Sequence, residues 1–167
     1  MESKSGESKS ESKEERWAKE DKKFSKDEGA VPEVDVHSII LPSDPEGGTD
    51  KPLGSALELI INFSLDMCVR DALWEVKFLV DCANERVIKI LGCTPRETLV
   101  KGKNTMRFTA DSIDFSSIKK STLANAGLLM AGLLIEGEEV CTVNMVVNVS
   151  QNDSTGALTR QILNPLA

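Results

Sequence analysis

The chain has 167 residues, with 20 Lys or Arg against 27 Asp or Glu and a formal net charge of −7. This length allows one domain of ordinary size plus tails, and the acidic balance disfavours nucleic acid and suits basic protein partners. No apolar run reaches the roughly 18 to 20 residues of a membrane span, and the first residues lack the apolar stretch of a signal peptide. We therefore expect an intracellular protein, cytoplasmic or nuclear, that is not secreted and does not contact membranes.

The N-terminal segment is highly charged. Its first 30 residues carry eight basic and nine acidic side chains and almost nothing apolar, so they cannot bury enough surface to offset the entropy of ordering. We predict that residues 1–32 form a disordered charged tail. Trp17 and Phe24 are seven residues apart, which would place both on one face of an induced helix. They are either a docking segment or isolated aromatics in a disordered tail.

Short strands are predicted along the middle of the chain, beginning with residues 34–41, 56–66 and 73–80. Residues 56–66 alternate, with Leu57, Leu59 and Ile61 on the apolar side, which is typical of a half-buried strand. Trp74, on the apolar side of residues 73–80, is expected to anchor the core.

Two further strands and one break in the pattern follow. Residues 86–91 and 105–110 are strand candidates. Residues 111–125 lose the period of two, and Asp111, Ser112 or Asp114 could cap a helical turn. We expect a short helix or an irregular crossover there.

The strongest signal is a hairpin over residues 126–150. Two apolar runs are joined only by residues 136–139, and Gly137 can take the positive φ that tight hairpin turns demand. In the second run, Thr142, Asn144 and Asn148 fall on the side opposite the apolar residues. This polar side either presents a binding surface or is an ordinary solvated face.

About seven strands with one helical break predict an all-β fold, an immunoglobulin-like antiparallel β-sandwich with a short helical crossover over residues 33–150. Residues 151–167 are expected to be a C-terminal tail. Its Ile162, Leu163 and Leu166 would pack back on the sandwich or engage a partner.

The sequence offers little for catalysis or metal binding. It has one His, four Cys with no C-x-x-C pair, and no phosphate-binding or nucleophile motif. We expect no enzyme activity, no catalytic residues, no metal site and no cofactor.

Five segments together resemble a known family. They are VDVHSIILPSDP, LELIINFSLDM, DALWEVKFLV, LVKGKNTMRFTAD and LLIEGEEVCTVNMVVNV. In order and spacing they resemble the anti-silencing-function histone chaperones, whose core is an elongated immunoglobulin-like sandwich. The resemblance covers roughly residues 34–149.

The resemblance implies where partners would bind. That family grips a histone helix with an apolar patch, an Arg and an acidic stretch, and the corresponding positions here are Leu128, Thr142 and Lys89. A second family surface uses acidic residues just before the Trp strand, where this chain has Arg70 and Asp71. Thr142 and Lys89 replace a cation and an anion, so histone contacts would differ.

We therefore expect a non-enzymatic protein-binding module, an adaptor or a subunit of a larger assembly, that binds a helix or a strand of a protein partner. The alternative is a histone chaperone that binds core histones with altered contacts.

Overall fold

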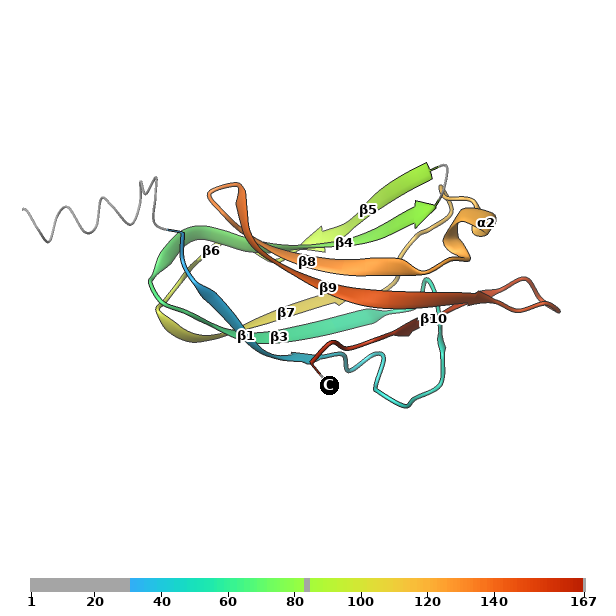
Figure 1. The fold of residues 1–167 in the computed structure, drawn as a ribbon, viewed down its shortest axis with the longest axis horizontal. Helices are drawn as coiled ribbons and strands as arrows, with labels where there is room; N and C mark the ends of the chain where they lie inside the picture. The colour runs from blue at the N-terminus through green and yellow to red at the C-terminus, as the bar shows by residue number, and fades with distance from the viewer. Residues whose placement is uncertain (1–30, 83–84, 167) are drawn as a thin grey trace, which may run out of the picture.

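The computed structural model describes residues 31–82 and 85–166, which form an antiparallel β-sandwich of two sheets (Figure 1). The expected fold class is confirmed. The strands and the short helix are β1 (Val34–Ile40), β2 (Lys51–Pro52), β3 (Leu57–Leu65), β4 (Val69–Cys82), β5 (Glu85–Cys93), β6 (Glu97–Leu99), β7 (Gly102–Ala110), α2 (Lys120–Leu123), β8 (Gly127–Ile135), β9 (Glu138–Gln151) and β10 (Leu158–Ile162). The expectations for residues 1–30, including Trp17 and Phe24, lie outside the described residues.

The smaller sheet contains three strands in the order β1, β3, β7. Its central strand β3 alternates as predicted, with Leu57, Leu59, Ile61 and the residues that continue this side buried against the other sheet. A bulge between Val36 and Ser38 shifts the pairing of β1 with β3 by one residue.

The larger sheet has the order β2, β10, β9, β8, β4, β5, and β6 pairs with β4. Its two long strands, β4 and β9, have 14 residues each. The β8–β9 hairpin turns at Glu136 and Gly137, which have φ values of 52° and 85°. Positive φ at both central residues suits the right-handed twist of paired strands, so the predicted hairpin is confirmed.

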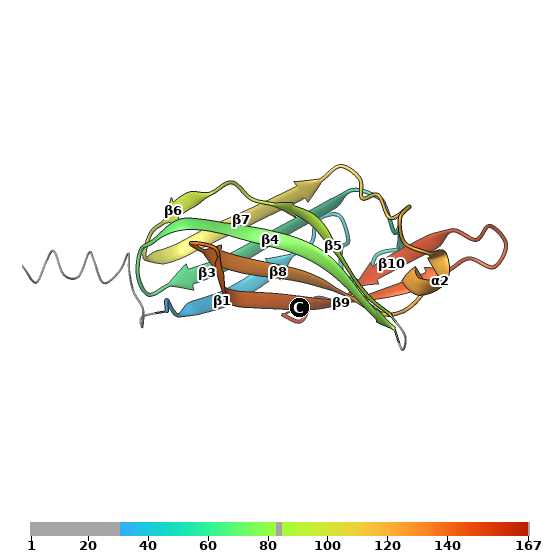
Figure 2. The same cartoon turned by 90° about the horizontal axis from the view of Figure 1, so that it is seen from above.

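The core lies between the two sheets and is aliphatic, apart from a few aromatic rings. Trp74 is 3% exposed and meets Phe63 edge to face, with ring centroids 5.2 Å apart, which confirms its expected anchoring role. Figure 2 shows β5 and β7 along one side of the sandwich and β1 and β9 along the other. That arrangement leaves β1 and the first part of β9 as neighbouring edge strands.

The predicted helical break is present but short. The helix α2 has four residues, and its N-cap, Lys119, makes no side-chain capping bond. Asp114 does not cap this helix. It accepts the backbone N–H of Ser116 at 2.9 Å, so this residue stabilises the loop before the helix instead.

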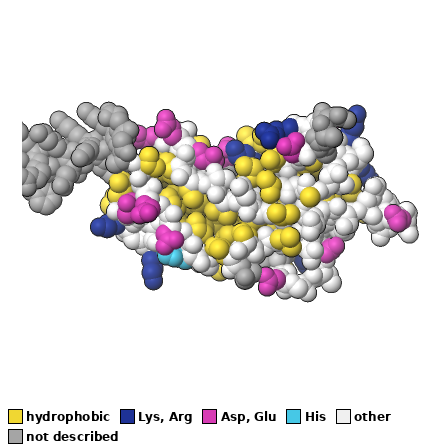
Figure 3. All heavy atoms as spheres, in the orientation of Figure 1, with side chains coloured by type: hydrophobic (Ala, Val, Ile, Leu, Met, Phe, Trp, Pro, Cys, Tyr) yellow, Lys and Arg dark blue, Asp and Glu magenta, His cyan; other side chains and the backbone are white. Residues whose placement is uncertain are grey.

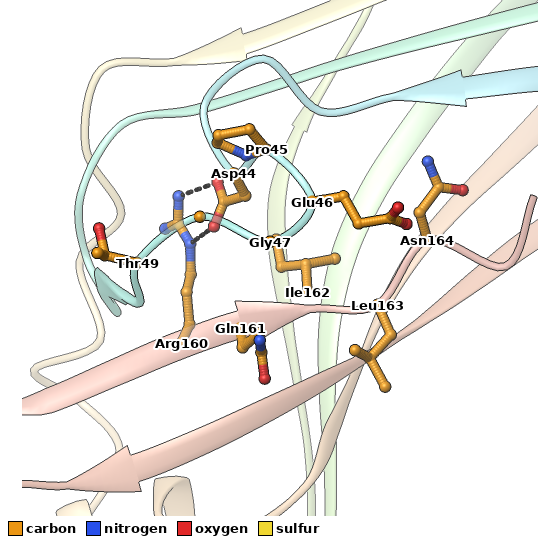
Figure 4. A pocket seen from close by; sticks show the side chains of 11 residues that line it. Asp44, Pro45, Glu46, Gly47, Thr49, Arg160, Gln161, Ile162, Leu163 and Asn164 are labelled. Atoms are coloured by element: carbon orange, nitrogen blue, oxygen red, sulfur yellow. Dashed lines mark hydrogen bonds and ion pairs between the residues drawn. The ribbon is translucent and has the colours of Figure 1, made fainter. Parts of the chain in front are cut away.

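The C-terminal segment differs most from the sequence-based expectation of a tail. Residues 158–162 form β10, which pairs with β9 and with β2. Arg160 is 3% exposed, and its guanidinium donates two hydrogen bonds of 2.8 Å to the carboxylate of Asp44 (Figure 4). It also donates to the backbone carbonyls of Leu53, Ser55 and Ala56. A buried charge needs such complete pairing, so Arg160 joins β10 to the loop after β1.

No helix in residues 31–82 and 85–166 is both long enough and apolar enough to cross a bilayer.

Candidate protein-binding face

The candidate site is the side of the larger sheet that faces away from the core, here called the outer face. On β4, β8 and β9, alternate residues point into the sandwich and are buried, including Val76, Ala131 and Met145. The residues between them point to the outer face. Thr142, Asn144 and Asn148 are on this face and are exposed, in agreement with the predicted alternation of β9.

An apolar row crosses the outer face from strand to strand. The register aligns Ile88 with Leu79, Leu79 with Leu128, and Leu128 with Val146. Leu163 extends the row, because its backbone N–H donates to the carbonyl of Val146 at 2.8 Å. The apolar row is defined by these five residues, which come from β5, β4, β8, β9 and the segment after β10.

The neighbouring row adds more apolar surface. It aligns Ile90, Lys77, Met130 and Asn144. Ile90 is 58% exposed and Ile88 is 53% exposed. Together with Val146 and Leu163, these two residues make up half of the eight exposed large hydrophobic side chains found in the described part of the chain. Such concentration on one face is typical of an interaction surface.

Carboxylates lie at one flank of these rows. Glu75, Gly132 and Thr142 are aligned across β4, β8 and β9. Gly132 carries no side chain, and the carboxylate of Glu139 occupies the space where a Cβ would stand. Lys77 lies 3.8 Å from Glu75. The outer face therefore has an apolar centre and a carboxylate flank, with Thr142 beside the carboxylates.

Asn148 lies beyond the apolar row on the other flank. It is paired with Gln161 of β10. Of the predicted binding residues, Leu128, Thr142, Asn144 and Asn148 therefore share the outer face, with Thr142 and Asn148 on opposite flanks of the apolar row.

Lys89 is not on this face. It pairs with Phe78, which is 3% exposed and points into the sandwich, so Lys89 points to the inner side of β5. There it contributes to lowering the pKa of Asp114, after the larger effects of the side-chain and backbone hydrogen bonds from Ser116. The position inferred from the family resemblance therefore does not join Leu128 in one site.

Arg70 and Asp71 lie at the beginning of β4, next to the β8–β9 turn. The carboxylate of Asp71 accepts a hydrogen bond of 2.7 Å from Arg96, and its carbonyl accepts the N–H of Glu136 at 2.9 Å. Asp71 has a φ of 54°, which few non-glycine residues adopt. Asp71 thus has a structural role at a bend of β4, and this pair forms a separate location from the outer face.

Two hollows lie near the C-terminus. One of about 140 Å³ lies between the loop of residues 44–49 and residues 160–164 (Figure 4), and a second of about 270 Å³ lies beside Ile39, Ile40 and Ile162. The guanidinium N–H groups of Arg160 are all used within the protein. Arg160 is therefore not available to bind an anion in the first hollow.

The other reactive side chains are dispersed. His37 pairs with Ser64 at 2.7 Å and lies 3.8 Å from Asp35. Burial, with a smaller contribution from Glu139, raises the pKa of the Cys141 thiol. Within residues 31–82 and 85–166, no three His, Cys, Asp or Glu side chains lie close enough to hold a metal ion.

Comparison with known proteins gives no family. No protein-family model matches the chain, and no curated protein matches it.

Sequence reasoning missed three exposed apolar members of the outer face, Ile88, Ile90 and Val146, and it named Leu163 as a possible partner contact without placing it on this face. Val146 interrupts the polar side of β9, and this apolar residue in the sequence could have indicated an apolar patch on that side. On β5 the order of polar and apolar residues suggests buried isoleucines, whereas the structure exposes Ile88 and Ile90 and turns Lys89 inward.

Proposed function

We propose that this chain is a non-enzymatic protein-binding module, an adaptor or subunit of a larger assembly, that docks an amphipathic helix of a partner on the outer face. The observation that carries the proposal is the apolar row, in which Ile88, Val146 and Leu163 are each more than 40% exposed. Exposed apolar side chains add nothing to the stability of the isolated sheet. An aligned apolar surface can, however, bury the apolar stripe of a partner helix.

The dimensions of the row suit a helix. Five neighbouring strands are separated by four spacings of about 4.8 Å, which gives about 19 Å. A helix rises 1.5 Å per residue, so about 13 residues, or between three and four turns, cover this length. A helix that lies across the strands would contact the row with residues spaced three and four apart.

The carboxylates beside the apolar rows indicate which charge the partner helix should carry next to its apolar stripe. Glu75 and Glu139 lie on one side of the rows, and Lys77 offsets only part of their charge. We infer a helix with an apolar stripe and a basic residue beside it, because charge complementarity favours the correct partner and orientation.

A second candidate is a histone chaperone with altered contacts. It is favoured by the same combination of an apolar centre with Leu128 and a carboxylate flank, which suits a basic histone helix. The family resemblance assigns Thr142 to a position where that family has an Arg. A histone chaperone of this kind would therefore need Glu75 and Glu139 to contact the histone in place of that Arg.

The test is affinity capture with the full chain followed by calorimetric titration with the captured partner. We expect the double variant Ile88→Glu/Val146→Glu to lose the partner. Val100 is a matched control, since it is 58% exposed and lies on the segment between β6 and β7, so Val100→Glu should keep the partner.

A partner retained by Ile88→Glu/Val146→Glu would contradict the outer face as the binding site. A purified core histone pair, titrated in the same way near physiological salt, separates the two candidates. Binding that requires Ile88 and Val146 would identify the histone chaperone.

A further inference from the structure

The sandwich has a second unpartnered surface, on the side where β1 and β9 run as edges. β10 pairs with β9 only from Val147 to Gln151, and the outer edge of β1 pairs with no strand in the described part of the chain. Figures 1 and 2 both place these two edges on the same side of the molecule. We call this surface the open side.

Apolar side chains that point inward are left partly exposed along the open side. Val34 and Val36 of β1 pair with buried Leu65 and Phe63, and they are themselves only half-buried. On β9, Val140 and Cys141 are also half-buried and pack against the core. Figure 3 shows the resulting hydrophobic surface between β9 and β1.

Carboxylates surround one end of the open side. β1 begins at this end, β3 ends there, and the β8–β9 hairpin turns there. The carboxylate rim consists of five exposed residues, Glu33, Asp35, Asp66, Glu136 and Glu138. Figure 3 shows acidic side chains at this end of the face, together with Lys or Arg side chains at its margin. An occupant with apolar and basic side chains would fit such a surface.

The chain itself contains a segment with that composition. Residues 16–26, RWAKEDKKFSK, have five basic and two acidic side chains and include both Trp17 and Phe24. The residues on either side of this segment carry more acidic than basic side chains. Basic charge and aromatic side chains are therefore concentrated in one short stretch of the N-terminal 30 residues.

The connection to the domain is long enough. Nine residues lie between Phe24 and Val34, so ten Cα-to-Cα steps join them and span up to about 33 to 36 Å when extended. The seven residues of β1 cover about 23 Å, so Phe24 can reach any point along the open side. In a helix, Trp17 and Phe24 would be about 10.5 Å apart. This separation is close to the spacing of about 10 Å between packed sheets.

We propose that residues 16–26 dock on the open side of their own domain, with Trp17 and Phe24 against Val34, Val36, Val140 and Cys141 and with the basic side chains toward the carboxylate rim. This contact is intramolecular and leaves the outer face free. It is thus independent of the proposed helix-binding function, and either proposal can fail without the other.

The reactivity of Cys141 tests the contact in the full-length chain. The labelling rate with a maleimide is measured for each cysteine by peptide mass spectrometry. In Trp17→Ala/Phe24→Ala we expect the Cys141 rate to rise at least about fivefold, because the labelling rate is proportional to the fraction of time that the contact is open, and a contact open about one fifth of the time slows labelling about fivefold. Cys93 is exposed on the outer face, so its rate should stay the same.

Charge variants separate this contact from a general effect of the tail. Lys22→Glu/Lys23→Glu should also raise the Cys141 rate, whereas Lys4→Glu/Lys9→Glu, which makes the same charge change outside the segment, should not. Added salt should raise the rate in the native chain and have little effect in Trp17→Ala/Phe24→Ala.

Equal Cys141 rates in the native chain and Trp17→Ala/Phe24→Ala would overturn the proposal. Protection of Cys141 that grows with protein concentration would also overturn it, since it would place the segment on a second copy. An equal rise in Lys4→Glu/Lys9→Glu would show that residues 16–26 are not the occupant.

Discussion

On both sheets, alternate strand residues point away from the core and form an outer surface. These residues are mostly paired polar side chains on the smaller sheet, whereas an apolar row crosses the larger sheet. On the smaller sheet, Thr105 donates to Asn62 at 2.8 Å, and Asn62 donates to Ser38 at 2.8 Å, so a chain of hydrogen bonds crosses all three strands. Arg107 forms an ion pair with Glu58 on the same surface. On the larger sheet, the corresponding line across the strands is the apolar row.

The difference supports our proposal that a partner would bind the larger sheet. Polar side chains that satisfy one another across a sheet gain nothing from a new partner and lose water on burial. Exposed aliphatic side chains gain free energy whenever a partner covers them, by roughly 25 cal/mol for each Å² of apolar surface removed from water. The outer surface of the smaller sheet is covered by paired polar side chains, whereas that of the larger sheet exposes apolar ones.

The largest expected effect comes from Arg160, which holds β10 and therefore Leu163 in the larger sheet. Arg160→Ala leaves the Asp44 carboxylate buried without its partner, so we expect a loss of about 3 to 5 kcal/mol in the free energy of unfolding. Denaturant unfolding measures this loss. Arg86→Ala removes an exposed ion pair with Asp81 and should cost at most about 1 kcal/mol. Similar losses for both variants would contradict the structural role of Arg160.

Partner binding should distinguish the two sheets. Ile88→Glu/Val146→Glu places two charges in the apolar row, and we expect affinity for the partner to fall at least about thirtyfold, or about 2 kcal/mol. Ile40 is 45% exposed on the outer surface of the smaller sheet, so Ile40→Glu should leave the affinity unchanged. Calorimetry provides both values, and a larger loss for Ile40→Glu would reverse the assignment.

The polar network predicts a smaller difference in stability. Asn62→Ala breaks two hydrogen bonds across the smaller sheet, and we expect it to lower the free energy of unfolding by about 0.5 to 1.5 kcal/mol. Asn144 is exposed on the outer face, and Asn144→Ala should change stability by less than about 0.5 kcal/mol. Thermal unfolding of the two variants makes the comparison, and equal shifts would show that the network does not stabilise the sheet.

The smallest effect concerns the pH dependence of two cysteines. Burial and Glu139 raise the pKa of Cys141, so its thiolate should form at a higher pH than that of an ordinary thiol. Because the thiolate is the reactive species, the rate of maleimide labelling at Cys141 should rise at higher pH than the rate at exposed Cys93. A rise at lower pH for Cys141 than for Cys93 would contradict the half-buried position of Cys141.

The sequence predicts those strands in which the apolar residues are the buried ones and the polar residues are the exposed ones. β3 follows from its alternation, and the β8–β9 hairpin follows from two apolar runs joined by a glycine at a position with positive φ. β10 was missed because its central residue, Arg160, is charged, and only the distant Asp44 makes its burial favourable. No local pattern reveals a pair 116 residues apart.

The candidate site could be predicted only in part. Thr142, Asn144 and Asn148 follow from the alternation of β9, whereas Leu128 was inferred from the family resemblance, and all four lie on the outer face. Lys89 was assigned by resemblance, but β5 is an edge strand with a shifted register between its pairs with Val76 and Lys77. Its inner side is only partly covered, so a Lys can point inward while Ile88 and Ile90 face solvent.

Site-specific photo-crosslinking in cells tests the central claim most directly. Val146 and Ile40 are similarly exposed, at 41% and 45%, and lie on the outer surfaces of the two sheets. Each is replaced in turn by p-benzoylphenylalanine in the full chain. Our account predicts a discrete crosslinked partner from position 146 and none from position 40. Crosslinking from position 40 without crosslinking from position 146 would contradict it.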